Sequence, residues 1–193
     1  MSLEQPEYTV LYRDGAIEYR QYQPYLVAET VVANPADYGD AGNEGFRRLF
    51  QYISGANSGR TSIDMTAPVA RKPSSEKIDM TAPVQRIEAA DGWKVSFMLP
   101  TSYTLETAPI PTDGRVRIAE VPGRLMAVVR YSGRWTERNL LARTDELRAA
   151  VAAAKVDAIG DFESAAYDPP YMLPFMRRNE VMVEVNRLPA SAE

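Results

Sequence analysis

The pattern of apolar positions near the start of the chain predicts three β-strands, over residues 8–12, 16–22 and 25–32. These stretches are rich in Tyr, Val and Ile, which strands favour. Asp14-Gly15 is typical of a two-residue hairpin turn between the first two strands. The tyrosines of these strands are interpreted as half-buried sheet residues, and a role for one of them as a ligand or proton donor stays open: Tyr8, Tyr12, Tyr19, Tyr22 and Tyr25.

The periodicity then changes to that of a helix over residues 43–54. Phe46, Leu49, Phe50 and Ile53 recur at i, i+3, i+4 and i+7, which makes one apolar stripe. We expect Leu49 and Ile53 to be buried against the sheet, and the two phenylalanines to form a pocket wall. The ends of this helix have their own candidates, which are Asp40 or Asn43 as N-cap and Gly55 at the left-handed position after the last turn.

The second half of the chain repeats the element order of the first in outline. A second helix is predicted over residues 135–155, with Leu140, Thr144, Leu147 and Val151 on one side. Further strands are predicted over residues 93–99, 116–121, 125–131, 162–167 and 180–185. This order predicts a single α+β domain over residues 1–193, in which two similar halves, about 8–100 and 115–186, form a mainly antiparallel sheet. A pocket would form where the halves meet.

The heptapeptide Ile-Asp-Met-Thr-Ala-Pro-Val occurs twice, over residues 63–69 and 78–84. Its apolar and polar residues alternate as in a strand, and its proline ends or edges the strand. One interpretation is therefore a hairpin of two similar edge strands. The other is that Met65 and Met80 help line an apolar ligand site, because thioethers adapt to flat ligands.

A second dense segment runs from residue 167 to 183. Three prolines stiffen a loop that carries Tyr171, Met172, Phe175 and Met176, and Arg177, Arg178 and Glu180 follow directly. Such a loop is typical of the rim of a site for an amphipathic ligand with acidic groups, because Arg binds carboxylates bidentately. The alternative is a plain turn with an arginine paired to Glu180. Since residues alternate across a strand, we expect Arg178 and Glu180 to share one face and Arg177 to point to the other.

Composition excludes several kinds of chemistry. The 193 residues include no cysteine and no histidine, so thiolate nucleophiles, Ser-His-Asp triads, the usual zinc sites and histidine-ligated haem iron are excluded. No metal site or catalytic residue is predicted. The formal charge of −4 argues against a nucleic-acid partner. No stretch reaches the ~20 apolar residues that span a bilayer. A cytoplasmic protein is the default expectation, and a periplasmic one stays open if an N-terminal signal has been removed.

The motifs together resemble those of the SOUL haem-binding protein family over nearly the whole chain. The resemblance rests on I-E-Y-R-Q-Y near the start, G-N-E-G-F-R-R-L-F-Q-Y-I-S-G-A-N, the doubled M-T-A-P-V that bacterial-type members often carry, F-M-L-P, Y-D-P-P and R-R-N-E-V. It implies a distorted β-barrel of two pseudo-symmetric halves with two flanking helices. The effector-binding domains of bacterial multidrug regulators share that fold.

The resemblance also implies which positions face a tetrapyrrole. Gln21 stands where some members are proposed to have an axial histidine. Phe46 and Phe50 align with helix residues thought to contact the ring, whereas Asn43 and Gln51 replace basic residues proposed to hold the propionates. The residues predicted to bind the ligand are Phe46, Phe50, Met65, Met80, Tyr171, Met172, Phe175, Met176, Arg177 and Arg178.

The sequence therefore leaves three candidate functions. The first is binding of haem, a related tetrapyrrole or another flat hydrophobic ligand without histidine ligation; haem attachment would then be weak. The second is an effector-binding sensor for cationic compounds, for which acidic residues such as Glu44, Glu120 and Glu180 are candidates. The third is an enzyme that uses Glu180 or a tyrosine as acid–base. Basic and apolar residues around the cavity would favour the first, acidic and aromatic ones the second.

Overall fold

The computed structural model describes residues 3–33, 38–59, 75–90 and 92–190. Within these residues, nine strands form one curled, half-barrel sheet in the order β1-β2-β9-β11-β10-β5-β6-β3-β8. Their bounds are β1 Tyr8–Asp14, β2 Ile17–Tyr22, β3 Tyr25–Ala33, β5 Val84–Ala89, β6 Gly92–Met98, β8 Val116–Val121, β9 Arg124–Tyr131, β10 Glu163–Ala166 and β11 Asn179–Glu184. Two short strands, β4 Asn57–Ser58 and β7 Ile110–Pro111, pair separately.

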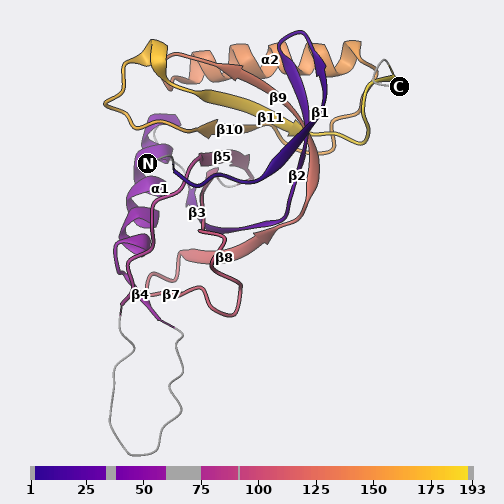
Figure 1. Ribbon diagram of the computed structural model, residues 1–193. Helices are drawn as coiled ribbons and strands as arrows, with labels where there is room; N and C mark the ends of the chain where they lie inside the picture. The colour runs from indigo at the N-terminus through magenta and orange to yellow at the C-terminus, as the bar shows by residue number, and fades with distance from the viewer. Residues whose placement is uncertain (1–2, 34–37, 60–74, 91, 191–193) are drawn as a thin grey trace, which may run out of the picture.

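Every strand pair among the described residues is antiparallel, and two long helices lie against the sheet. Helix α1 (Tyr38–Ile53) contacts β3 and β6, whereas α2 (Glu137–Ala153) contacts β9 and β11. In Figure 1, α1 lies at the left of the sheet and α2 across its top. The predicted α+β class is confirmed. The division into two similar halves stays a prediction. Within the described ranges, no helix has both the length and the apolar content needed to span a bilayer.

Helix α1 begins five residues before its expected start, so the predicted cap is wrong. Asp40 lies in the first turn and Asn43 lies inside the helix, and neither is the N-cap. The acidic Asp40 still suits the positive end of the helix dipole. The predicted division of the stripe is confirmed for its core half, because Leu49 and Ile53 are buried. Gly55 follows the helix with a φ of +118°, as expected.

Helix α2 agrees closely with its sequence pattern. The side chain of Thr136 caps its start and accepts a hydrogen bond from the backbone N–H of Asn139. The helix ends at Ala153, two residues before the expected end. The predicted apolar side is buried against the sheet and consists of Leu140, Thr144, Leu147 and Val151.

The second copy of the heptapeptide corrects the hairpin interpretation. Residues 78–83 form no strand, and β5 begins only at Val84. The backbone N–H of Ile78 donates to the carbonyl of Ile53, and that of Ala82 donates to the carbonyl of Glu4. The second copy thus bonds to the end of α1 and to the N-terminal segment. The first copy, with Met65, lies outside the described residues.

The strand registers divide the sheet into two faces. The face toward the helices, here called the helix face, carries Val129, Val181 and Val95. Arg86 of β5 lies on this face, because it is in register with Val95. The other side, here called the opposite face, carries Glu180, which is in register with Arg130 of β9. Burial of the helix face forms the main core, whereas the opposite face also buries charged side chains.

Candidate functional site

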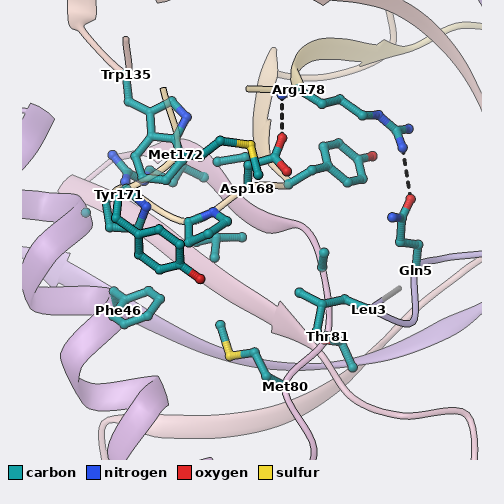
Figure 2. A pocket seen from close by; sticks show the side chains of 18 of the residues that line it. Leu3, Gln5, Phe46, Met80, Thr81, Trp135, Asp168, Tyr171, Met172 and Arg178 are labelled. Atoms are coloured by element: carbon teal, nitrogen blue, oxygen red, sulfur yellow. Dashed lines mark hydrogen bonds between the residues drawn. The ribbon is translucent and has the colours of Figure 1, made fainter. Parts of the chain in front are cut away.

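A cavity of about 800 Å³ lies on the helix face, between α1, β5 and the proline-rich segment after β10. We call it the α1 cavity. Phe46 of α1, Met80 of the heptapeptide, and Tyr171 and Met172 of the proline-rich segment are among its lining residues. Figure 2 shows these side chains around one space, with Trp135 above and Leu3 and Thr81 on the other side. The volume falls in the usual range of small-molecule sites.

The aromatic wall of the α1 cavity comes from the outward part of the α1 stripe. The ring of Phe46 packs edge-on against Phe97 of β6, with 5.2 Å between the centroids. It also stacks on Phe50, with a centroid separation of 5.9 Å. Phe46 lines the cavity, whereas Phe50 lies one turn further along the helix and does not. Both rings are partly exposed, which leaves apolar surface for a ligand to cover.

The proline-rich segment is held in place by Arg177. Its Nε donates to the carbonyl of Met172 at 2.9 Å, and its Nη2 donates to the carbonyl of Pro170. The guanidinium also lies over the ring of Trp135, 5.1 Å from its centroid. These contacts hold the backbone on either side of Tyr171. The side chain of Tyr171 lines the α1 cavity, with 87% of its surface exposed.

Five of the ten predicted ligand residues line the α1 cavity: Phe46, Met80, Tyr171, Met172 and Arg178. Phe175, Met176 and Arg177 instead border a second cavity of about 540 Å³ on the opposite face, beside the β1–β2 hairpin. The apolar side chains of the proline-rich loop therefore do not all line the same cavity. The 3₁₀ turn at Pro174–Met176 directs its two large side chains away from the α1 cavity.

Arg178 and Glu180 lie close together, as predicted. The Nη2 and Nε atoms of Arg178 donate to Oε1 of Glu180 at 2.8 and 3.0 Å. The same carboxylate accepts two hydrogen bonds from Arg20 and one from the hydroxyl of Tyr167. Glu180 is completely buried. Burial raises the pKa of Glu180, but the hydrogen bonds and charges of Arg20 and Arg178 lower the pKa further, to below its ordinary value.

The acidic candidates for a cation site do not line the α1 cavity. Glu44 forms ion pairs with Arg47 and Arg48. Glu120 borders a separate cavity of about 250 Å³, and Glu180 is enclosed by its partners. Asp168 is the acidic residue among those that line the α1 cavity, and its carboxylate accepts from the backbone N–H of Arg178. The basic residues there are Arg86 and Arg178.

Sequence reasoning missed three residues of this region. Trp135 lines the α1 cavity, and its indole N–H donates to the side chain of Asn179. Arg86 enters the cavity from β5, a strand that was not predicted. Arg20 binds Glu180 across 160 positions of sequence, so no local pattern could reveal the pair. Trp135 and Arg86 did carry a signal, because Trp135 stands at the start of the predicted second helix and Arg86 lies two residues after the second heptapeptide.

A model of the SOUL heme-binding protein family matches residues 3–184. The chain belongs to this family. Heme-binding protein 1 of Xenopus laevis is 27% identical over 88% of this chain and 84% of that protein. Heme-binding protein 1 of Mus musculus is 28% identical over 89% and 83%.

Solved structures share the fold of this SOUL protein at low sequence identity. The C-terminal domain of EcmrR superposes with a TM-score of 0.62 at 11% identity, covering 94% of this chain and 99% of that one. A hydrolase from Listeria innocua superposes with a TM-score of 0.52 at 10% identity, covering 96% and 94%. Identities this low establish the shared fold alone.

Proposed function

We propose that the α1 cavity binds haem, a related tetrapyrrole or another flat hydrophobic ligand, without histidine ligation. The observation that carries the proposal is the coincidence of SOUL family membership with a large cavity whose walls are apolar and aromatic. Two curated relatives are named for heme binding. The cavity is built from the family motifs, since α1, the second heptapeptide copy and the Y-D-P-P segment each contribute to it.

The residues present fit such a ligand. Phe46, Met80, Tyr171 and Met172 offer aromatic and thioether surface to a ring system, and thioethers adapt well to flat molecules. Arg86 and Arg178 supply positive charge at the same cavity, which suits the acidic substituents of a natural tetrapyrrole. Haem, when bound, supplies an iron centre, and the chain contains no imidazole or thiolate to ligate it. Attachment therefore depends on apolar burial and on positive charge at the cavity.

The effector-binding alternative rests on the likeness to the EcmrR domain, which concerns the fold alone. A site for cationic compounds attracts them through acidic groups, besides the aromatic faces that suit flat ligands of either kind. The charged residues lining the α1 cavity are two arginines and Asp168, whose carboxylate is already bonded to a backbone N–H. This balance favours a neutral or acidic ligand over a cationic one. We therefore rank the tetrapyrrole proposal first.

The test is titration of haem into tag-free protein, followed by absorbance, because a histidine tag would supply an axial ligand. We expect weak, saturable binding without the spectrum of a six-coordinate bis-nitrogen haem. Phe46→Ala removes an aromatic wall and should weaken binding. A sharp low-spin Soret band with nanomolar affinity would contradict the proposed ligation, and no saturable binding of any porphyrin would contradict the function.

Phe175→Ala is the matched control, because its ring borders the second cavity. Unchanged affinity in this variant would place the ligand in the α1 cavity alone. A loss equal to that of Phe46→Ala would instead support the sequence-based proposal that Phe50, Phe175 and Met176 also contact the ring.

A further inference from the structure

Arg86 has an unusual position at the α1 cavity. It enters from β5 on the helix face, and its guanidinium passes directly beneath α1. A Cβ atom added to Gly42 would lie only 2.2 Å from the Cζ of Arg86 and 2.3 Å from each of its Nη atoms. The absent side chain of Gly42 therefore makes the space that the guanidinium occupies. On another side the guanidinium lies over the ring of Tyr38, 4.8 Å from its centroid.

The hydrogen-bonding capacity of Arg86 is mostly unused. Its single side-chain hydrogen bond to a described residue runs from Nη1 to the carbonyl of Tyr38, at a long 3.4 Å. A guanidinium has five N–H donors. None of the carboxylates in the described ranges forms an ion pair with Arg86. By contrast, Arg178 at the same cavity donates to both Glu180 and Gln5.

A half-buried cation without a counter-ion attracts an anion strongly, because the apolar walls weaken solvent screening. The tyrosine ring behind the guanidinium leaves its donors free for a planar acceptor. Asn43, the neighbour of Gly42 on α1, also lines the cavity, and its side-chain amide offers further N–H donors there.

We propose that Arg86, in the space made by Gly42, is the anchor for a carboxylate of the ligand, and that the α1 cavity therefore selects acids. The ligand class is a flat apolar body that carries at least one free carboxylate. This inference rests on the proposed function and adds the group that determines specificity. The anchor comes from β5, while α1 carries the uncharged Asn43 and Gln51 at the positions where the family resemblance implies basic residues.

The experiment compares two probes with the same ring system: metal-free protoporphyrin IX, which has two free carboxylates, and its dimethyl ester, in which both are capped and uncharged. Both are titrated into tag-free protein under the same buffer and detergent conditions. A hydrogen-bonded ion pair stabilises by about 1.5–3 kcal/mol, which corresponds to roughly tenfold to a hundredfold tighter binding of the diacid. Arg86→Gln should remove this preference, leaving affinity for the ester unchanged.

Two further variants keep the result interpretable. Gly42→Ala leaves Arg86 in the chain but places a methyl group where the guanidinium lies, so the acid preference should fall as in Arg86→Gln. Arg47→Gln removes a charge from α1 that is exposed, paired with Glu44 and outside the cavity, so the preference should stay. Thermal melting of each variant shows whether the fold is retained.

The outcomes separate the two proposals. Equal binding of diacid and ester by the wild-type chain would overturn the acid selectivity while the proposed function stands. A diacid preference that persists in a folded Arg86→Gln variant would overturn the role of Arg86. Failure of both probes to bind would overturn the proposed function and this inference with it.

Discussion

Two buried or half-buried arginines, on opposite faces of one sheet, differ in their surroundings. Arg20 is 2% exposed, and its guanidinium donates to Glu18, Tyr22 and Glu180. Arg86 is half-buried, packs on an aromatic ring and a glycine, and makes one long side-chain hydrogen bond within the described ranges. The two side chains lie in different regions. Arg20 borders the second cavity on the opposite face of the sheet, whereas Arg86 lines the α1 cavity.

The difference distinguishes an arginine whose charge stabilises the fold from an arginine whose charge is available to a ligand. Burial of a charge is costly unless a partner neutralises it, so a paired group such as Arg20 supports the fold. A cation that stays unpaired at an apolar cavity retains its capacity to bind an anion. Arg178 lies between the two regions, because it lines the α1 cavity but pairs with Glu180. The following predictions separate these roles.

The largest effect is expected for Arg20→Met. This change leaves Glu180 buried with one fewer cation, and removal of one partner of a buried pair costs about 3–5 kcal/mol of unfolding free energy. Because Arg178 and Tyr167 still bond to Glu180, we expect the lower end of that range. Denaturant unfolding measures the loss. Arg13→Met is the control, since Arg13 is exposed and should change stability by less than about 1 kcal/mol. Equal losses would contradict the comparison.

Arg178→Ala should have an intermediate effect. It removes a half-buried partner of Glu180, and an expected loss of about 1–3 kcal/mol corresponds to one charge-assisted interaction. Porphyrin affinity should change less than stability, because Arg178 already pairs within the protein. Melting and porphyrin titration of the same variant test this. An unchanged melting temperature together with lost binding of the diacid would show that Arg178, not only Arg86, anchors the ligand.

Acid should destabilise the protein partly through Glu180. Its folded pKa lies below the ordinary value despite burial, because Arg20 and Arg178 bind the charged form. The stabilisation is therefore present at neutral pH and is lost as the pH falls below the ordinary glutamate range and through the folded pKa. Glu180→Gln should lower the melting temperature at pH 7 and reduce its further fall between pH 5 and 3. An identical fall in both proteins would contradict the assignment.

The smallest effect on stability is expected for Arg86→Gln. The side chain has no ionic partner in the described part of the chain and loses mainly its cation–π contact with Tyr38, so the unfolding free energy should change by less than about 1 kcal/mol. Chemical denaturation, compared with Arg20→Met in one series, gives the contrast directly. A loss above about 1.5 kcal/mol would show that Arg86 is structural and would weaken the case for a ligand anchor.

Local pattern predicted much of the fold, for identifiable reasons. The tyrosine- and valine-rich runs near the start became β1, β2 and β3, and the stripe of α2 became its buried side. The two-residue period of a strand was enough to place Arg178 beside Glu180. Strand β5 was missed, because its sequence Val-Gln-Arg-Ile-Glu-Ala places Arg86 and Glu88 on one face and the polar Gln85 on the other. It also follows a motif that was interpreted as the strand itself.

The candidate site was predicted in part. Phe46, Met80, Tyr171, Met172 and Arg178 were found because motifs mark their segments, and they converge on one cavity. Phe175 and Met176 were grouped with them because they are neighbours in sequence, whereas the 3₁₀ turn directs them to another cavity. Residues that are adjacent in a loop need not line the same cavity.

The sequence by itself determined the family, the α+β class, the absence of imidazole and thiolate ligands, and the segments that carry the site. Each of these depends on residue identity or on short-range periodicity. Only the tertiary structure decided which charges are neutralised, because Arg20 meets a carboxylate 160 residues away and Arg86 meets none in the described residues. The missing side chain of Gly42 likewise matters only in the folded protein, where β5 places the guanidinium of Arg86 beneath α1. Long-range pairing thus separates the arginine that stabilises the fold from the one free to bind a ligand.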